Sequence, residues 1–168
     1  VDRRQRQMCI RDRSSIREEI IELLPIDLYQ VNDSMQQMEH SVEAILPWLQ
    51  HNNKNVEIIS ILVPYMPFER TTEISEALSE AIKTVASKRN WKWGTDYAFV
   101  ISNDAVHYGD EDWGGKNFAR YGTDSLGYSQ AFAHEKEIIT TISGALTQEK
   151  VKQFTLFTIQ ENDHKEYK

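Results

Sequence analysis

The residues best suited to acid/base chemistry are Asp104 and His107, in the stretch SNDAVHYG that spans residues 102–109. A carboxylate three residues before an imidazole can select the tautomer of the ring or raise its basicity, as a general base requires. The same spacing also suits an aspartate that caps a loop beside a solvent-facing histidine. The spacing by itself leaves both interpretations open.

A second candidate is the stretch EHSVE, residues 39–43. Glu39 and Glu43 lie one helical turn apart, and His40 shares a face with Glu43 at i, i+3 spacing. This arrangement could gather polar groups for substrate contact. Acidic residues near a helix start also interact favourably with the helix dipole, so capping explains both glutamates equally well.

Other chemistry-bearing residues give weaker signals. The aromatic residues between 108 and 128 could line a pocket or simply pack a loop; they are Tyr108, Trp113, Phe118, Tyr121 and Tyr128. His51, His134 and His164 lie among polar residues and are expected to be solvated. The chain has no P-loop, dinucleotide-binding glycine motif, G-x-S-x-G or H-E-x-x-H, so those enzyme classes have no sequence support.

Apolar periodicity predicts the elements that must position these residues. Helices are expected over 14–24, 38–50, 71–89, 125–145 and 148–162, the last with Thr147 as its N-cap. Two β-branched runs, 56–63 and 96–102, are typical of buried strands, and the polar stretches 27–37 and 103–123 are expected to be loops.

The order strand, helix, strand predicts a right-handed parallel crossover and hence an α/β domain with helices on both faces of a sheet. Ligands in such sheets collect outside the carboxyl ends of the strands, where residues 102–109 would lie. Two strands are too few for a free-standing sheet of this class, so the remaining strands are expected outside this sequence.

Composition restricts the possible functions. The 168 residues carry a net charge of −7, which argues against a general nucleic-acid binder because phosphate binding needs clustered Lys and Arg. No apolar run is long enough to predict a membrane span. One Cys cannot form an internal disulfide, so we expect a cytoplasmic protein with neither nucleic acid nor membrane as partner.

The first thirteen residues, VDRRQRQMCIRDR, differ from the rest of the chain. Their codons match a transposase-based sequencing adapter read in frame, so we expect residues 1–13 to be non-native. Because this segment holds five Arg, two Asp and the single Cys, the other 155 residues carry a charge of −10 and no thiol. Residues 14–168 are then expected to be part of one domain that lacks its N-terminal strands and its C-terminal part.

Taken together, the two polar motifs resemble one family. The ordered set EHSVEAILPWL (39–49), a strand ending in Val-Pro (63–64) and S-x-D-x-x-H-Y-G (102–109) is similar to the Memo family, whose bacterial and archaeal members are called AmmeMemoRadiSam system protein B. The resemblance covers about residue 38 to the C-terminus. It implies an α/β fold with a three-layer arrangement of sheet and helices, like that of the class III extradiol dioxygenases, incomplete in this sequence.

The resemblance also implies roles for individual residues. His107 matches the position of the catalytic base of the dioxygenases, with Asp104 as its orienting partner, and His40 matches a pocket-lining histidine. Substrate contact is expected from five residues: Glu39, Ser41, Glu43, Ser102 and Tyr108.

The resemblance implies iron or copper in the full-length protein, held by two His in P-H-A-G-Y and S-H-H motifs and by a Cys. Residues 14–168 contain none of these three ligands, so we expect no metal site and no activity in this chain. The expected partner is a small molecule or peptide, with a radical-SAM system implied by the family. The alternative function is a non-catalytic module that binds a partner or peptide in a vestigial pocket; a two-metal hydrolase is disfavoured because no dense carboxylate and histidine cluster occurs.

Overall fold

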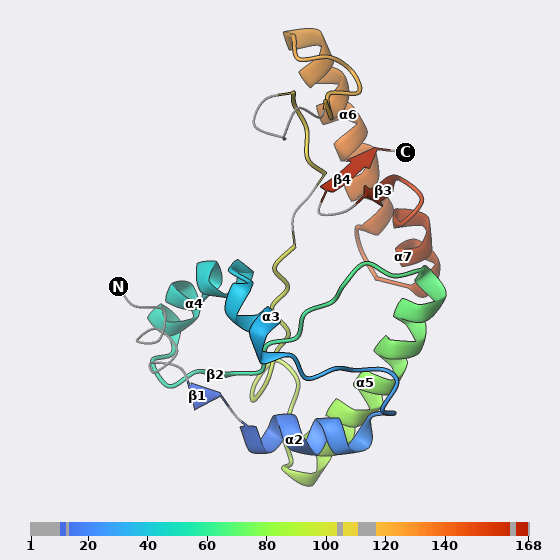
Figure 1. Ribbon diagram of the computed structural model, residues 1–168. Helices are drawn as coiled ribbons and strands as arrows, with labels where there is room; N and C mark the ends of the chain where they lie inside the picture. Colours follow the sequence, from blue (N-terminus) through green and yellow to red (C-terminus); the bar gives the residue numbers. More distant parts are fainter. Residues whose placement is uncertain (1–10, 13, 104–105, 111–116, 162–163, 168) are drawn as a thin grey trace. The chain divides into compact units, whose positions relative to one another are not determined.

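The computed structural model describes residues 11–12, 14–103, 106–110, 117–161 and 164–167 (Figure 1). The chain divides into two compact units, unit 1 (Val1–Asn103) and unit 2 (Asp104–Lys168). Each unit is described by itself. Asp104 and Trp113, both singled out by the sequence, lie outside the described residues.

The core of unit 1 lies between helices α2 (Ser14–Leu23) and α5 (Phe68–Lys88). Both form where apolar periodicity predicted them, and α2 ends before Pro25, which cannot continue a helix. The contact between the two helices consists of four buried side chains, Ile16, Ile20, Ala81 and Val85. Burial of this apolar stripe is the main source of helix stability here, because isolated helices of this length are marginal in water.

An ion pair supports the same contact. The Arg89 guanidinium donates two hydrogen bonds to the Glu19 carboxylate, one of them from Nη1 to Oε2 at 2.9 Å. This hydrogen bonding lowers the pKa of Glu19 and raises that of Arg89. The Arg89 guanidinium also lies 5.5 Å from the centre of the Trp91 ring, so the end of α5 is tied both to α2 and to the chain that follows it.

Residues 27–52 differ from the expected pattern of one loop and one helix. The structure has two helices, α3 (Asp33–Met38) and α4 (Ser41–Asn52), so the prediction of a loop throughout 27–37 is wrong. The Asn32 side chain caps α3 by accepting a hydrogen bond from the amide of Met35 at 3.1 Å. This hydrogen bond satisfies a backbone amide at the start of α3. The periodicity of apolar residues does not indicate a cap of this kind, so it did not predict the helix.

The predicted strands are largely absent from the described residues. Only Glu57–Ile58 of the run 56–63 forms a strand, β2, and it pairs in parallel with β1, Arg11–Asp12. Of the run 96–102, only Tyr97 takes part in a bridge, with Trp93. The expected crossover between these runs is therefore not formed. Both runs have strand-forming composition, but a strand also needs a neighbour to receive its hydrogen bonds, and the described residues supply few.

Unit 2 contains α6 (Ser125–Ile142), α7 (Gln148–Phe154) and a hairpin of β3 (Thr158–Glu161) with β4 (His164–Tyr167). Both N-caps are side-chain acceptors: Asp124 accepts from Gly127 N at 2.7 Å, and Thr147 accepts from Lys150 N at 3.3 Å. The expected cap at Thr147 is thus confirmed. The expectation that this helix continues to residue 162 is wrong, because the chain turns into β3 after α7.

The described residues are mostly helical, with two small two-stranded sheets. Within them, no helix combines the length and apolarity needed to cross a membrane. The parallel strand pair expected from the runs 56–63 and 96–102 is not present in the described part of the chain.

Candidate functional site

The EHSVE segment joins α3 to α4, and its geometry is that of a helix cap. The Glu39 carboxylate accepts hydrogen bonds from the amides of His40 at 2.8 Å and Ser41 at 2.7 Å. These donors are at the start of α4, where no preceding carbonyl is available to them. Hydrogen bonding by Ser41, and next by His40, lowers the pKa of Glu39. An ionised Glu39 suits a cap and is not suited to donate a proton at neutral pH.

His40 lies on the outside of this junction. Its side chain is 87% exposed, and its Nδ1 is 3.8 Å from the Glu39 carboxylate. Ser41 and Glu43 are half-buried on the first turn of α4. The structure therefore brings Glu39, His40 and Ser41 together through a cap, while the His40 imidazole is directed into solvent.

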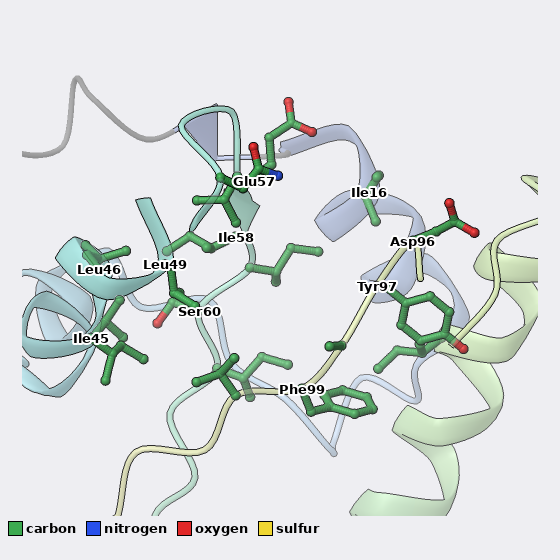
Figure 2. A pocket seen from close by; sticks show the side chains of 18 of the residues that line it. Ile16, Ile45, Leu46, Leu49, Glu57, Ile58, Ser60, Asp96, Tyr97 and Phe99 are labelled. Carbon is green, nitrogen blue, oxygen red and sulfur yellow. The ribbon is translucent and has the colours of Figure 1, made fainter. Parts of the chain in front are cut away.

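A pocket of unit 1 is lined mainly by apolar side chains, with polar residues among them. It has a volume of about 750 Å³ and lies among α2, α4, β2, α5 and the extended chain 94–102. Figure 2 shows side chains from these segments facing the same space, including Ile16, Ile45 and Phe99. Two residues predicted for substrate contact, Ser41 and Ser102, both line this pocket.

Two carboxylates at the pocket were not singled out by the sequence analysis. Glu57 and Asp96 are the charged residues among the described side chains that line it (Figure 2). Asp96 accepts a hydrogen bond from the amide of Lys92 at 2.8 Å, in the turn that follows α5. Both residues belong to runs that were predicted to be buried strands. For that reason they were not considered as polar residues that could line a cavity.

The SNDAVHYG segment crosses from unit 1 into unit 2, where His107 and Tyr108 are half-buried. The Tyr108 hydroxyl donates to the carbonyl of Gly122 at 2.9 Å and accepts from the amide of Tyr121 at 3.2 Å. Its ring centre is 5.5 Å from that of Tyr128. Substrate contact by Tyr108 stays a prediction; in this structure its hydroxyl is hydrogen-bonded to the chain that leads into α6.

Gly109 adds a second attachment to the same loop. Its carbonyl accepts from the amide of Phe118 at 2.8 Å, and it is buried with φ 134°, a conformation that favours glycine. His107 is therefore next to a segment fixed by hydrogen bonds on its C-terminal side. A fixed backbone is what a proton-transferring imidazole needs if it is to meet a substrate in one orientation.

The surroundings of His134, on α6, differ from those expected from the sequence. The residue was expected to be solvated, but its side chain is only 23% exposed and packs between the rings of Tyr121, at 6.1 Å, and Phe157, at 5.9 Å. Its Nδ1 lies 3.5 Å from the Glu137 carboxylate, one turn further along α6. The i, i+3 spacing of His134 and Glu137 was the sequence signal that could have predicted their closeness.

The described residues do not fit a transition-metal centre. Among them, no three His, Cys, Asp or Glu side chains come close enough together to hold an ion. The pocket of unit 1 is lined by two carboxylates and by no histidine in the described set. Non-haem iron commonly requires two histidines and a carboxylate in one place, and these residues do not provide that set.

The described part of the chain is rich in helices, with a mainly apolar pocket in unit 1 and a loop in unit 2 that is held by the Tyr108 hydroxyl. Comparison with protein families identifies the class: the sequence model of the Memo-like protein family matches residues 12–162. The chain therefore belongs to the Memo-like family. No curated protein and no solved structure gives a significant match.

Proposed function

We propose that the chain represents a Memo-like protein of the kind called AmmeMemoRadiSam system protein B, related to the class III extradiol dioxygenases. The observation that carries this proposal is the family match over 12–162, which includes both polar motifs. The acidic composition and the single Cys, itself within the adapter-like segment, favour a cytoplasmic location. A radical-SAM system is the partner that this family relationship favours.

In this proposal His107 is the acid/base residue. It would accept a proton from the substrate and return one to the product, with Asp104 selecting the ring tautomer. The support is the anchoring of the adjacent backbone by the Tyr108 hydroxyl and by the hydrogen bond between Gly109 and Phe118. Iron or copper in a full-length protein would supply the redox chemistry, and the described residues do not provide its ligands.

The chain by itself is proposed to be inactive. The test is oxygen uptake by the purified 168-residue chain with catechol as substrate and added ferrous iron. We expect the same rate as a protein-free blank, and the same rate for His107→Ala. Uptake above the blank that His107→Ala abolishes would contradict the inactivity and support acid/base catalysis within this chain.

One observation favours a second candidate, a non-catalytic module that binds a partner or peptide. The described pocket has a volume of about 750 Å³ and is lined mainly by apolar side chains, with Ser41 and Ser102 among its polar residues. Apolar concavities of this size commonly hold ligands. A binding module predicts that His107→Ala leaves binding at this pocket unchanged, whereas the enzyme proposal predicts a loss of turnover in a full-length protein.

A further inference from the structure

Two tyrosine rings of unit 2 lie against each other. The ring centres of Tyr108 and Tyr128 are 5.5 Å apart, and the ring planes are inclined by 57°. Aromatic rings at this separation are in direct contact. Tyr108 is the residue after His107, and Tyr128 lies near the start of α6, so the contact joins two segments that are distant in the sequence.

Backbone contacts keep this pair together. The Tyr108 hydroxyl donates to the carbonyl of Gly122 and accepts from the amide of Tyr121. The chain at Gly122 lies directly against α6, because a Cβ on Gly127 would overlap the Gly122 carbonyl. The position of the Tyr108 ring is therefore set by the same segment that touches the start of α6.

The two rings differ in their access to solvent. Tyr128 is 52% exposed, whereas Tyr108 is half-buried. An oxidant in solution reaches the Tyr128 phenol directly, and water accepts its proton. Exposed side chains reorient within picoseconds to nanoseconds, which lets an ortho carbon of Tyr128 approach the neighbouring ring.

We propose that Tyr108 and Tyr128 form an oxidative cross-linking site, at which hydrogen peroxide activated by a haem peroxidase couples the two rings into dityrosine. The inference goes beyond the proposed acid/base function and does not depend on it. The new bond fastens the segment next to His107 covalently to α6.

The coupling consumes one peroxide for each cross-link. Each ring loses one electron and its phenolic proton and becomes a neutral phenoxyl radical. The two radicals form one carbon–carbon bond between ortho carbons, and the hydrogen on each of these carbons moves to the phenolic oxygen, so both rings become aromatic again. Hydrogen peroxide takes up the two electrons and two protons and is reduced to two water molecules.

Ring contact favours coupling within one chain over coupling between chains. Reactants that are held together react as a unimolecular pair, with an effective concentration far above that of other chains in a dilute solution. Two other tyrosines have different neighbours: the ring of Tyr97 contacts that of Trp93, and the ring of Tyr121 contacts that of His134. These two tyrosines serve as controls.

The test treats the dilute 168-residue chain with a haem peroxidase and hydrogen peroxide. We expect the blue fluorescence of dityrosine to appear while the chain stays monomeric on a denaturing gel. Mass spectrometry should show a chain that has lost two hydrogen atoms. After trypsin digestion, the peptides 93–116 and 121–136 should be found joined to each other.

Phenylalanine variants assign the cross-linked residues, because each of the two peptides contains two tyrosines. Tyr128→Phe keeps the ring and removes the phenol, so the fluorescence should fall to that of a sample without peroxide. Tyr108→Phe should have the same effect, whereas Tyr97→Phe and Tyr121→Phe should keep the wild-type yield. Circular dichroism checks that all variants keep their helices. Tyr108→Phe also removes two hydrogen bonds, so Tyr128→Phe is the deciding variant.

Three outcomes overturn the proposal. These are no dityrosine in the treated chain, an undiminished cross-link in Tyr128→Phe, and dityrosine only in covalent dimers of the chain. Loss of the cross-link in Tyr121→Phe with the helices intact would also contradict it, because the Tyr121 phenol would then be a coupling partner.

Discussion

The capping role of Glu39 gives the sharpest prediction, because the same residue was a candidate for substrate contact. The carboxylate accepts hydrogen bonds at 2.8 and 2.7 Å from two amides at the start of α4. Glu39 precedes His40, the N-cap residue of α4, and a net hydrogen bond is typically worth about 1 kcal/mol. We therefore expect Glu39→Ala to lower the free energy of unfolding by about 1 kcal/mol at neutral pH, measured by urea denaturation with far-UV circular dichroism.

The pH dependence follows from the direction of the pKa shift. Because the folded pKa of Glu39 lies below its ordinary value of 4.5, the stabilisation is fully present above 4.5 and is lost as the pH falls through the lower, folded pKa. The difference in free energy of unfolding between wild type and Glu39→Ala should therefore become smaller at acid pH. The free energy of unfolding of Glu39→Gln should lie between those of wild type and Glu39→Ala at neutral pH, because the glutamine amide oxygen can accept a hydrogen bond but carries no charge.

Glu18→Ala is the matched control. Glu18 is exposed on α2, away from any helix start, and its replacement should change stability by less than about 0.5 kcal/mol. Equal effects of the Glu18 and Glu39 variants, or a Glu39→Ala difference that grows as the pH falls, would refute the capping argument.

Three further predictions concern the core and the loop before α6. Val85 is 2% exposed in the contact between α2 and α5, so Val85→Ala should leave a cavity there. We expect the free energy of unfolding, measured by urea denaturation, to fall by about 2 kcal/mol. An effect as small as that of Glu18→Ala would contradict this packing. Tyr108→Phe removes the hydroxyl bound to Gly122 and Tyr121, so the Tyr121 amide should exchange with deuterium faster by mass spectrometry, and unchanged exchange would count against the anchor. Gly127→Ala should lower the melting temperature although alanine favours helices, because its Cβ would lie 2.3 Å from the Gly122 carbonyl; Ser129→Ala, on the exposed side of α6, should not.

The helices could be predicted because their signals are local. The apolar positions of α5 recur at helical spacing, and Thr147 precedes α7 as an N-cap, so neighbouring residues alone specify them. The end of α7 at Phe154 was missed because the hairpin that follows depends on pairing between β3 and β4. The composition of a short segment does not show whether another strand is in place to pair with it.

The candidate site shows the same division. The capping interpretation of Glu39 could be stated from sequence, since acidic residues near helix starts have a known physical benefit. The hydrogen bonds of the Tyr108 hydroxyl and the contact of the His134 ring with Phe157 could not, because both depend on residues distant in the chain. The strand-like composition of 56–63 was recognised, but only Glu57–Ile58 has a neighbour to pair with in the described residues.

The most direct test of the account is the metal content of the purified 168-residue chain. The chain is incubated with excess ferrous iron, or with copper, passed through a gel-filtration column and analysed by mass spectrometry for bound metal. We expect far less than one equivalent of either metal, because the described residues bring no three ligand side chains together. One tightly bound iron or copper ion per chain would contradict this account of the site.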